Sequence, residues 1–232
     1  MNRTRLNVAH GSWELIWAHV HRVLVVNLGI AVTNLPLLLA LQVSHQPWRH
    51  PVVFGLLLLV LPGPSLAAAF AYLGATTGDE QAPVRLFVRA YRQLFRRALL
   101  VSAPFVLLMI AAVADVVTLR TTGLGTAVVP MAAVAALVAA LAWPVALAHV
   151  AAGETVERRL FLLAPYAVVR HAGLALMNLV LGIVALVLVN QMPLLGLAVL
   201  PGCVLFVVWR NCRVMVALPG RHRPEAVLAT LS

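Results

Sequence analysis

Charged residues are scarce in this sequence. They make up 10% of the 232 residues, whereas hydrophobic residues make up 62% and the mean hydropathy is +0.98. A soluble domain carries about 25% charged residues, so a chain this poor in charge cannot cover a surface that faces water. Disorder is excluded as well, because disordered chains are poor in hydrophobic residues. The composition therefore predicts an integral membrane protein.

Lysine is absent and cysteine is rare. The 17 basic residues are all arginine, and this usage is typical of a GC-rich bacterial genome. The formal net charge of +10 is explained by arginine-rich cytoplasmic loops. No polar segment is long enough to fold as a nucleic-acid-binding module, so we expect no nucleic-acid partner. Cys203 and Cys212 lie on opposite faces of one predicted helix, which excludes a disulfide within it.

Long hydrophobic runs divide the chain into predicted membrane spans, each near the ~20 residues that cross a bilayer. We expect an all-α bundle of six transmembrane helices. The spans cover residues 23–41, 52–74, 98–119, 127–150, 172–189 and 194–209, the last extending to 218. Residues 23–218 would form a single membrane domain, preceded by a cytoplasmic segment of residues 1–22 and followed by a cytoplasmic tail of residues 219–232.

Arginine is distributed unequally between the two sides of this topology. One side holds only Arg49 and Arg120. The other holds Arg3, Arg5, Arg22, Arg85, Arg89, Arg92, Arg96, Arg97, Arg158, Arg159, Arg170, Arg210, Arg213, Arg221 and Arg223. Short cytoplasmic loops collect arginine, so we expect this second side, with both termini, in the cytoplasm. The protein would be a multi-pass protein of a bacterial plasma membrane.

The densest group of arginines lies in residues 85–97, before the third span. One helical face carries Leu86, Phe87, Ala90, Tyr91, Leu94 and Phe95, and the remainder carries Arg85, Arg89, Arg92, Arg96 and Arg97. This pattern predicts an amphipathic helix at the cytoplasmic surface, with its apolar face in the headgroup boundary. The arginines would contact anionic lipid headgroups or, as the alternative, dock a cytoplasmic partner.

Polar side chains inside the spans are few and neutral. Asn27 and Asn34 lie in the first span, Ser65 in the second and Asn178 in the fifth. We expect interhelical hydrogen bonds from them, the alternative being contacts to a substrate. Pro62, Gly63 and Pro64 interrupt the second span and predict a kink or break, because two prolines remove backbone donors. In transporters, such broken helices can line substrate sites.

Signatures of catalysis and metal binding are missing. The sequence has no His-Glu-x-x-His, no Gly-x-Ser-x-Gly, no phosphate loop and no cluster of Cys and His with metal-ligand spacing. We therefore expect no enzymatic activity, no metal and no cofactor.

Three stretches resemble a known family. They are the Asn-Leu-Gly start at Asn27 with its Asn-Leu-Pro end at Pro36, the Leu-Pro-Gly-Pro-Ser stretch from Leu61 to Tyr72, and the arginine-rich helix from Phe87 to Phe95. Together they resemble the YesL-like family of small bacterial polytopic membrane proteins, a domain of unknown function. The run Ala-Gly-Leu-Ala-Leu-Met-Asn at 172–178 is similar to the fifth span of that family. Leu61 stands where the family favours Thr.

This resemblance implies a polytopic protein often encoded beside carbohydrate-uptake transporters, and it implies no catalytic residues. We expect a non-enzymatic membrane protein of uncharacterised role, accessory to a carbohydrate transport system whose subunits would be its partners. The alternative is a small transporter or substrate-binding membrane subunit that uses the broken second span.

Overall fold

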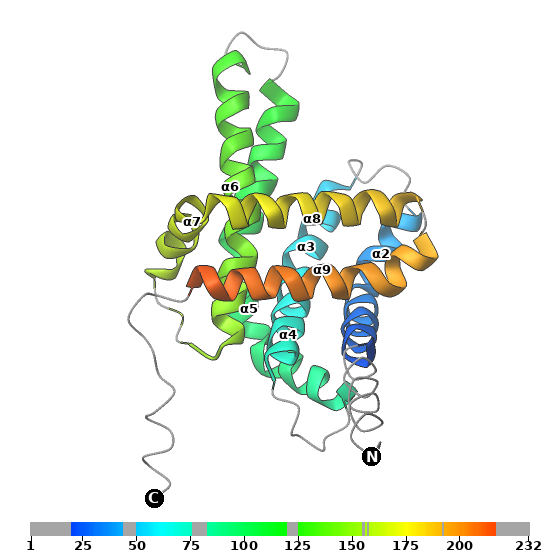
Figure 1. Cartoon of the computed structure of the whole chain (residues 1–232). Helices are drawn as coiled ribbons and strands as arrows, with labels where there is room; N and C mark the ends of the chain where they lie inside the picture. Colours follow the sequence, from blue (N-terminus) through cyan, green and yellow to red (C-terminus); the bar gives the residue numbers. More distant parts are fainter. Residues whose placement is uncertain are drawn as a thin grey trace, which may run out of the picture.

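The regular structure of this chain is helical wherever it is described. The computed structural model describes residues 20–43, 50–75, 83–119, 125–154, 156, 158–191 and 193–216 (Figure 1). A helix over Val20–Thr33 comes first. It is followed by α2 (Leu35–Val43), α3 (Pro51–Val60), α4 (Pro62–Gly74), α5 (Pro83–Leu119), α6 (Gly125–Ala151), α7 (Leu160–Arg170), α8 (Ala172–Gln191) and α9 (Pro193–Val216). The predicted all-α class is confirmed for these residues.

Three of the described helical segments are long and apolar enough to cross a membrane. They are Val52–Gly74, which combines α3 and α4, Pro83–Leu119, and Ala127–Ala151. They contain the predicted second, third and fourth spans, although the helix that holds the third span begins at Pro83 rather than at Ala98. A fourth is added if α7 and the first part of α8 are counted as one span, although these two meet at 92°.

The predicted first span is divided at Asn34. Val20–Thr33 ends there and α2 begins at Leu35, directly before Pro36. A proline restricts the residue before it and offers no backbone N–H, which explains why the helix is distorted at this point. Helical hydrogen bonds still cross the distortion, since Asn34 N donates to Ile30 O and Leu38 N donates to Asn34 O, both at 3.0 Å.

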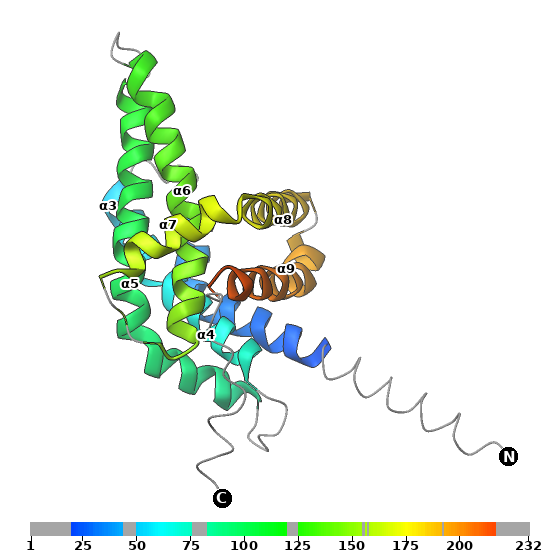
Figure 2. The same cartoon turned by 60° about the vertical axis from the view of Figure 1, so that its left-hand side comes forward.

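The longest helix, α5, forms an antiparallel hairpin with α6 whose tip projects beyond the rest of the molecule (Figures 1 and 2). Its 37 residues span about 55 Å at 1.5 Å per residue, whereas the hydrocarbon core of a bilayer is about 30 Å thick. The first turns of α5 bend away from its later part. They contain the arginine-rich residues 85–97, so this segment and the predicted third span form one continuous helix.

Four described helix ends that flank connections predicted to be cytoplasmic gather at one end of the molecule. The start of Val20–Thr33, the end of α4, the start of α5 and the end of α6 all lie opposite the tip of the hairpin (Figures 1 and 2). Arg22 Nη2 donates a hydrogen bond to Ala75 O at 3.4 Å, which joins two of these ends directly. We call this the arginine-rich end.

The last two helices, α8 and α9, run antiparallel to each other but across α5 and α6 (Figures 1 and 2). They occupy the predicted fifth and sixth spans, residues 172–189 and 194–209. Much of α8 is exposed, including Leu176, Val180 and Ile183. The orientation of this hairpin differs from that of an upright six-helix bundle, in which every helix follows the same axis.

The core lies where α4, α5 and α6 meet α7 and the end of α9. Its fully buried side chains are mostly small, and they include Ala67, Phe70, Ala98, Val101, Ala142, Ala146, Leu147 and Cys212. Small side chains let helix backbones approach closely, and this close packing drives helix association where no water needs to be displaced. A second cluster, with Val26, Ala69, Tyr72 and Phe87, joins Val20–Thr33 to α4 and α5.

Candidate functional site

The break predicted in the second span falls between α3 and α4. Val60 ends α3, Leu61 has φ −89° and ψ −50°, and Pro62 begins α4. Leu61 N still donates to Leu57 O at 3.0 Å, whereas Ser65 N reaches Leu61 O only at 3.4 Å. Because proline has no N–H, Pro62 and Pro64 remove two donors from this stretch. The result is a local irregularity inside an otherwise continuous apolar segment.

Gly63 places this irregularity directly against α5. A Cβ added to Gly63 would lie 2.8 Å from Ser102 Cβ, with Ser102 Oγ closer still. Gly63, Pro64 and Ser65 are all buried. Ser102 is itself fully buried and accepts a hydrogen bond of 2.9 Å from Trp143 Nε1 of α6. The broken segment therefore faces neighbouring helices, and it lines neither of the two cavities described below.

Two of the predicted polar residues, Asn34 and Ser65, are in contact. Asn34 Nδ2 donates to Ser65 Oγ at 3.0 Å and to Ile30 O at 2.9 Å, and Ser65 Oγ donates to Pro62 O at 2.9 Å. Asn34 is 8% exposed and Ser65 is 1% exposed. Asn34 Oδ1 is buried and has no hydrogen-bond partner among the residues that the structure describes. These contacts tie the distortion at Asn34 to the irregularity at Pro62.

Asn27 and Asn178 lie elsewhere. Asn27 faces α9, because a Cβ on Gly202 would come within 2.9 Å of Asn27 Oδ1 and 2.8 Å of Val23 O. Asn178 of α8 accepts a hydrogen bond of 2.6 Å from Asn211 Nδ2 of α9. Asn211 is not among the residues predicted from the sequence, although an asparagine in the amphipathic end of an apolar helix is the type of residue that pairs with another across a helix interface.

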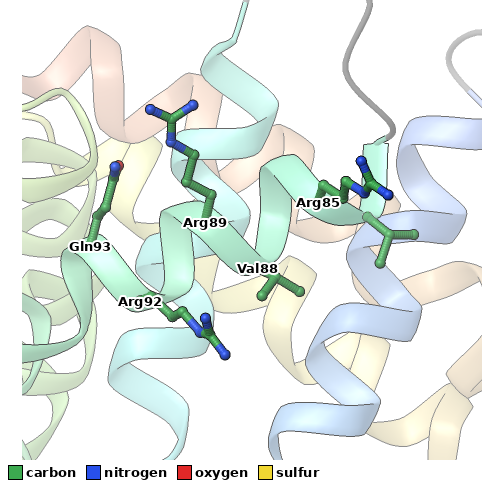
Figure 3. Close-up of a pocket in the computed structure, with 6 residues that line it drawn as sticks. Arg85, Val88, Arg89, Arg92 and Gln93 are labelled. Atoms are coloured by element: carbon green, nitrogen blue, oxygen red, sulfur yellow. The ribbon is translucent and has the colours of Figure 1, made fainter.

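The arginines of residues 85–97 line the outer side of α5. Arg85, Arg89 and Arg92 lie with Val84, Val88 and Gln93 along a shallow cavity of about 490 Å³ (Figure 3). Arg96 and Arg97 are exposed too. Within the described part of the chain, none of the five forms an ion pair. They give the described start of α5 a concentration of positive charge, which we call the α5 arginine face.

The apolar side of the same segment differs from expectation. The sequence places it in the headgroup boundary, but Phe87 is 3% exposed and packs in the second cluster with Leu86, Ala90 and Tyr91 around it. A Cβ on Gly29 would lie 2.6 Å from the Phe87 ring. The protein itself therefore covers Phe87 and part of this face, because Val20–Thr33 and α4 pack against Phe87 in the second cluster.

A second cavity was not predicted from the sequence. Its volume is about 600 Å³, and it lies between the end of α6, α7 and the end of α9. Its polar lining consists of His149, Glu154, Tyr166, Arg170, His171 and Arg213. His149 Nε2 lies 3.5 Å from Glu154 Oε2. These residues come from three separate parts of the chain, so no local sequence pattern could have indicated that they meet.

Neither cavity has the composition of a metal site. Across the described ranges, no three side chains of His, Cys, Asp or Glu lie together in a group that could hold a metal ion. The two cysteines, at positions 203 and 212, are both free thiols.

Comparison with known proteins returned no match, either to protein-family models, to curated proteins or to solved structures.

Proposed function

We propose that this chain is a non-enzymatic integral protein of a bacterial plasma membrane, with six spans and both termini in the cytoplasm, that acts as an accessory subunit of a transport system. The observation that carries the membrane part is the presence of three helices long and apolar enough to cross a bilayer. The accessory role rests on the resemblance of residues 27–36, 61–72 and 87–95 to the YesL-like family.

The charge distribution supports the proposed orientation. The start of Val20–Thr33 and the ends that flank α4, α5 and α6 lie together at the arginine-rich end (Figures 1 and 2). This clustering agrees with the rule that arginine collects on the cytoplasmic side. The α5 arginine face would then lie beside the inner leaflet, where each arginine near an anionic surface contributes about 1 kcal/mol of attraction.

The accessory role is tested by purification from native membranes in a mild detergent. We expect membrane subunits of a carbohydrate transporter to purify together with the tagged chain. The double variant Arg89→Gln/Arg92→Gln removes charge from the α5 arginine face without touching the core, since both side chains are exposed. If that face docks the partner, recovery of the subunits should fall in this variant. Purification without any transporter subunit would contradict the accessory role.

A small transporter or substrate-binding subunit is the second candidate. It is favoured by the buried oxygen of Asn34, which has no hydrogen-bond partner within the described part of the chain and lies beside the irregular second span. A solute bound there should raise the melting temperature of the purified protein. Asn34→Ala and, on the face toward α9, Asn27→Ala should remove that shift. If no sugar in a screen shifts the wild-type protein, this candidate fails.

A further inference from the structure

The cavity between α6, α7 and α9 combines apolar walls with a basic rim. Its apolar lining includes Val145, Ala148, Leu163, Ala164, Met215 and Val216, and its basic groups are His149, Arg170, His171 and Arg213. At about 600 Å³ it falls within the ~300–1,000 Å³ usual for small-molecule sites. A ligand that satisfies both parts carries an anionic group next to a hydrocarbon portion.

The two arginines give the rim its permanent positive charge. An arginine is not deprotonated in proteins, and within the described part of the chain neither Arg170 nor Arg213 forms an ion pair. Arg213 lies over the Trp209 ring, with Cζ 5.2 Å from the ring centroid, so its guanidinium is held in place by the aromatic face. Glu154 is the carboxylate among the described lining residues, and its Oε2 lies 3.5 Å from His149 Nε2.

The cavity is built partly from the last turns of α6. Val145, Ala148 and His149 belong to the last turns of α6, and α6 ends at the arginine-rich end (Figures 1 and 2). In the proposed orientation this end faces the inner leaflet, where anionic lipids are concentrated. Leu162 and Tyr166 of α7 are 77% and 60% exposed. Exposed leucine and tyrosine next to a basic rim are typical of the membrane interface.

We propose that this cavity binds an anionic phospholipid of the surrounding bilayer, with the phosphate between Arg170 and Arg213 and the start of the acyl chains along α6 and α7. The inference rests on the membrane insertion proposed above. The two can fail separately: a chain found without detergent in the soluble fraction overturns insertion, whereas an inserted chain that retains no anionic lipid overturns only this site.

A purely structural role for the arginines has to be separated from lipid binding. Both lie in the last turn of a helix, Arg170 in α7 and Arg213 in α9, where a cation also stabilises the negative end of the helix dipole. That stabilisation would be present in any lipid. Binding of an anionic lipid, in contrast, would be present only when such a lipid is available.

The first experiment identifies retained lipid on the full-length protein by native mass spectrometry, after purification in mild detergent from membranes that contain phosphatidylglycerol. We expect wild type to retain one phosphatidylglycerol per chain, and Arg170→Gln/Arg213→Gln to lower the retained fraction by about tenfold or more. The matched control, Arg158→Gln/Arg159→Gln, removes the same charge from two exposed arginines that do not line the cavity, and it should retain the lipid as wild type does. An equal loss in both variants, or no retained lipid in wild type, would overturn the proposal.

The second experiment compares melting temperatures in nanodiscs of phosphatidylglycerol and of phosphatidylcholine. Wild type should melt several degrees higher in phosphatidylglycerol, and Arg170→Gln/Arg213→Gln should lose this difference while melting like wild type in phosphatidylcholine. Arg170→Lys/Arg213→Lys keeps both charges and should restore most of the difference. A Gln variant that melts equally lower in both lipids would show a structural role. Displacement of the lipid by millimolar inorganic phosphate would indicate a site for a soluble anion, and either result overturns the proposal.

Discussion

Gly63 allows α4 to pack directly on α5, and this makes it a sensitive position. In Gly63→Ala, the new methyl group would lie 2.8 Å from Ser102 Cβ and closer still to Ser102 Oγ, so one helix must shift. Overpacking of this kind costs about 1–3 kcal/mol. We expect the melting temperature of the purified protein in detergent to fall accordingly.

Gly182 supplies the matched control for that substitution. It lies in α8, and a Cβ added there meets nothing within 4 Å. Gly182→Ala should be neutral or stabilising by up to about 1 kcal/mol, because alanine favours a helix over glycine. If both glycine variants melt alike, the close approach of α4 and α5 is disproved.

The pair formed by Asn178 and Asn211 is the clearest polar link between α8 and α9. The two amides are each 8% exposed and are joined by a hydrogen bond of 2.6 Å. Interhelical hydrogen bonds in membrane proteins contribute about 0.6 kcal/mol on average and about 1.7 kcal/mol at most. A double-mutant cycle of Asn178→Ala and Asn211→Ala should therefore give a coupling energy in that range. A coupling of zero would show that the two side chains do not meet.

At the scale of elements, Phe87 fixes the first turns of α5 to the rest of the protein. Its ring is 3% exposed and lies against Gly29 and the second core cluster. Truncating a buried phenylalanine costs about 3–5 kcal/mol. We expect Phe87→Ala to lower the denaturant midpoint strongly, and Val88→Ala, whose side chain is 44% exposed, to change it little. Equal effects of the two substitutions would mean that this segment lies in the headgroup boundary, as its sequence pattern alone suggests.

The contrast at Phe87 shows what periodicity can and cannot predict. The spacing of Arg85, Arg89 and Arg92 predicts one polar face, because three and four residues return to the same side of a helix, and all three side chains are exposed. The same spacing cannot tell whether the apolar face contacts lipid or another helix, since both are apolar environments. Only the position of Val20–Thr33 decides this, and that position depends on distant contacts such as Gly29 with Phe87.

For the candidate sites too, the sequence indicates single residues, whereas their contacts depend on how distant helices pack. Asn34 and Ser65 could be selected from the sequence because a polar side chain in an apolar run needs a partner, but their mutual contact depends on how two helices pack. The cavity with Arg170 and Arg213 could not be anticipated at all. Arg170 and Arg213 lie at helix ends, where basic residues are common. They line one cavity only because of how the helices pack, including the bend of 92° between α7 and α8.

At the scale of the whole molecule, the hairpin of α8 and α9 is the part whose relation to the bilayer matters most. The 20 residues of α8 span about 30 Å, enough for the hydrocarbon core. Its surface carries exposed apolar side chains, namely Leu176, Val180, Ile183, Val187 and Leu188. Such a surface is stable in lipid rather than in water. The hairpin nevertheless runs across α5 and α6 (Figure 1). Six spans therefore require it to stand upright in the bilayer.

Accessibility labelling at three positions tests this requirement. In a background with Cys203→Ala and Cys212→Ala, single cysteines are introduced as Gln93→Cys, Thr121→Cys and Gln191→Cys, and intact cells are treated with a membrane-impermeant maleimide. Gln93 lies on the exposed side of α5 and Gln191 at the end of α8. We expect labelling at 121 and 191 before lysis and at 93 only after lysis. Labelling of 93 and 121 from one side would disprove the crossing of α5. Protection of 191 until lysis would leave α8 and α9 on the cytoplasmic side, reducing the protein to four spans, because a hairpin lying across the bundle cannot expose its turn to the outside.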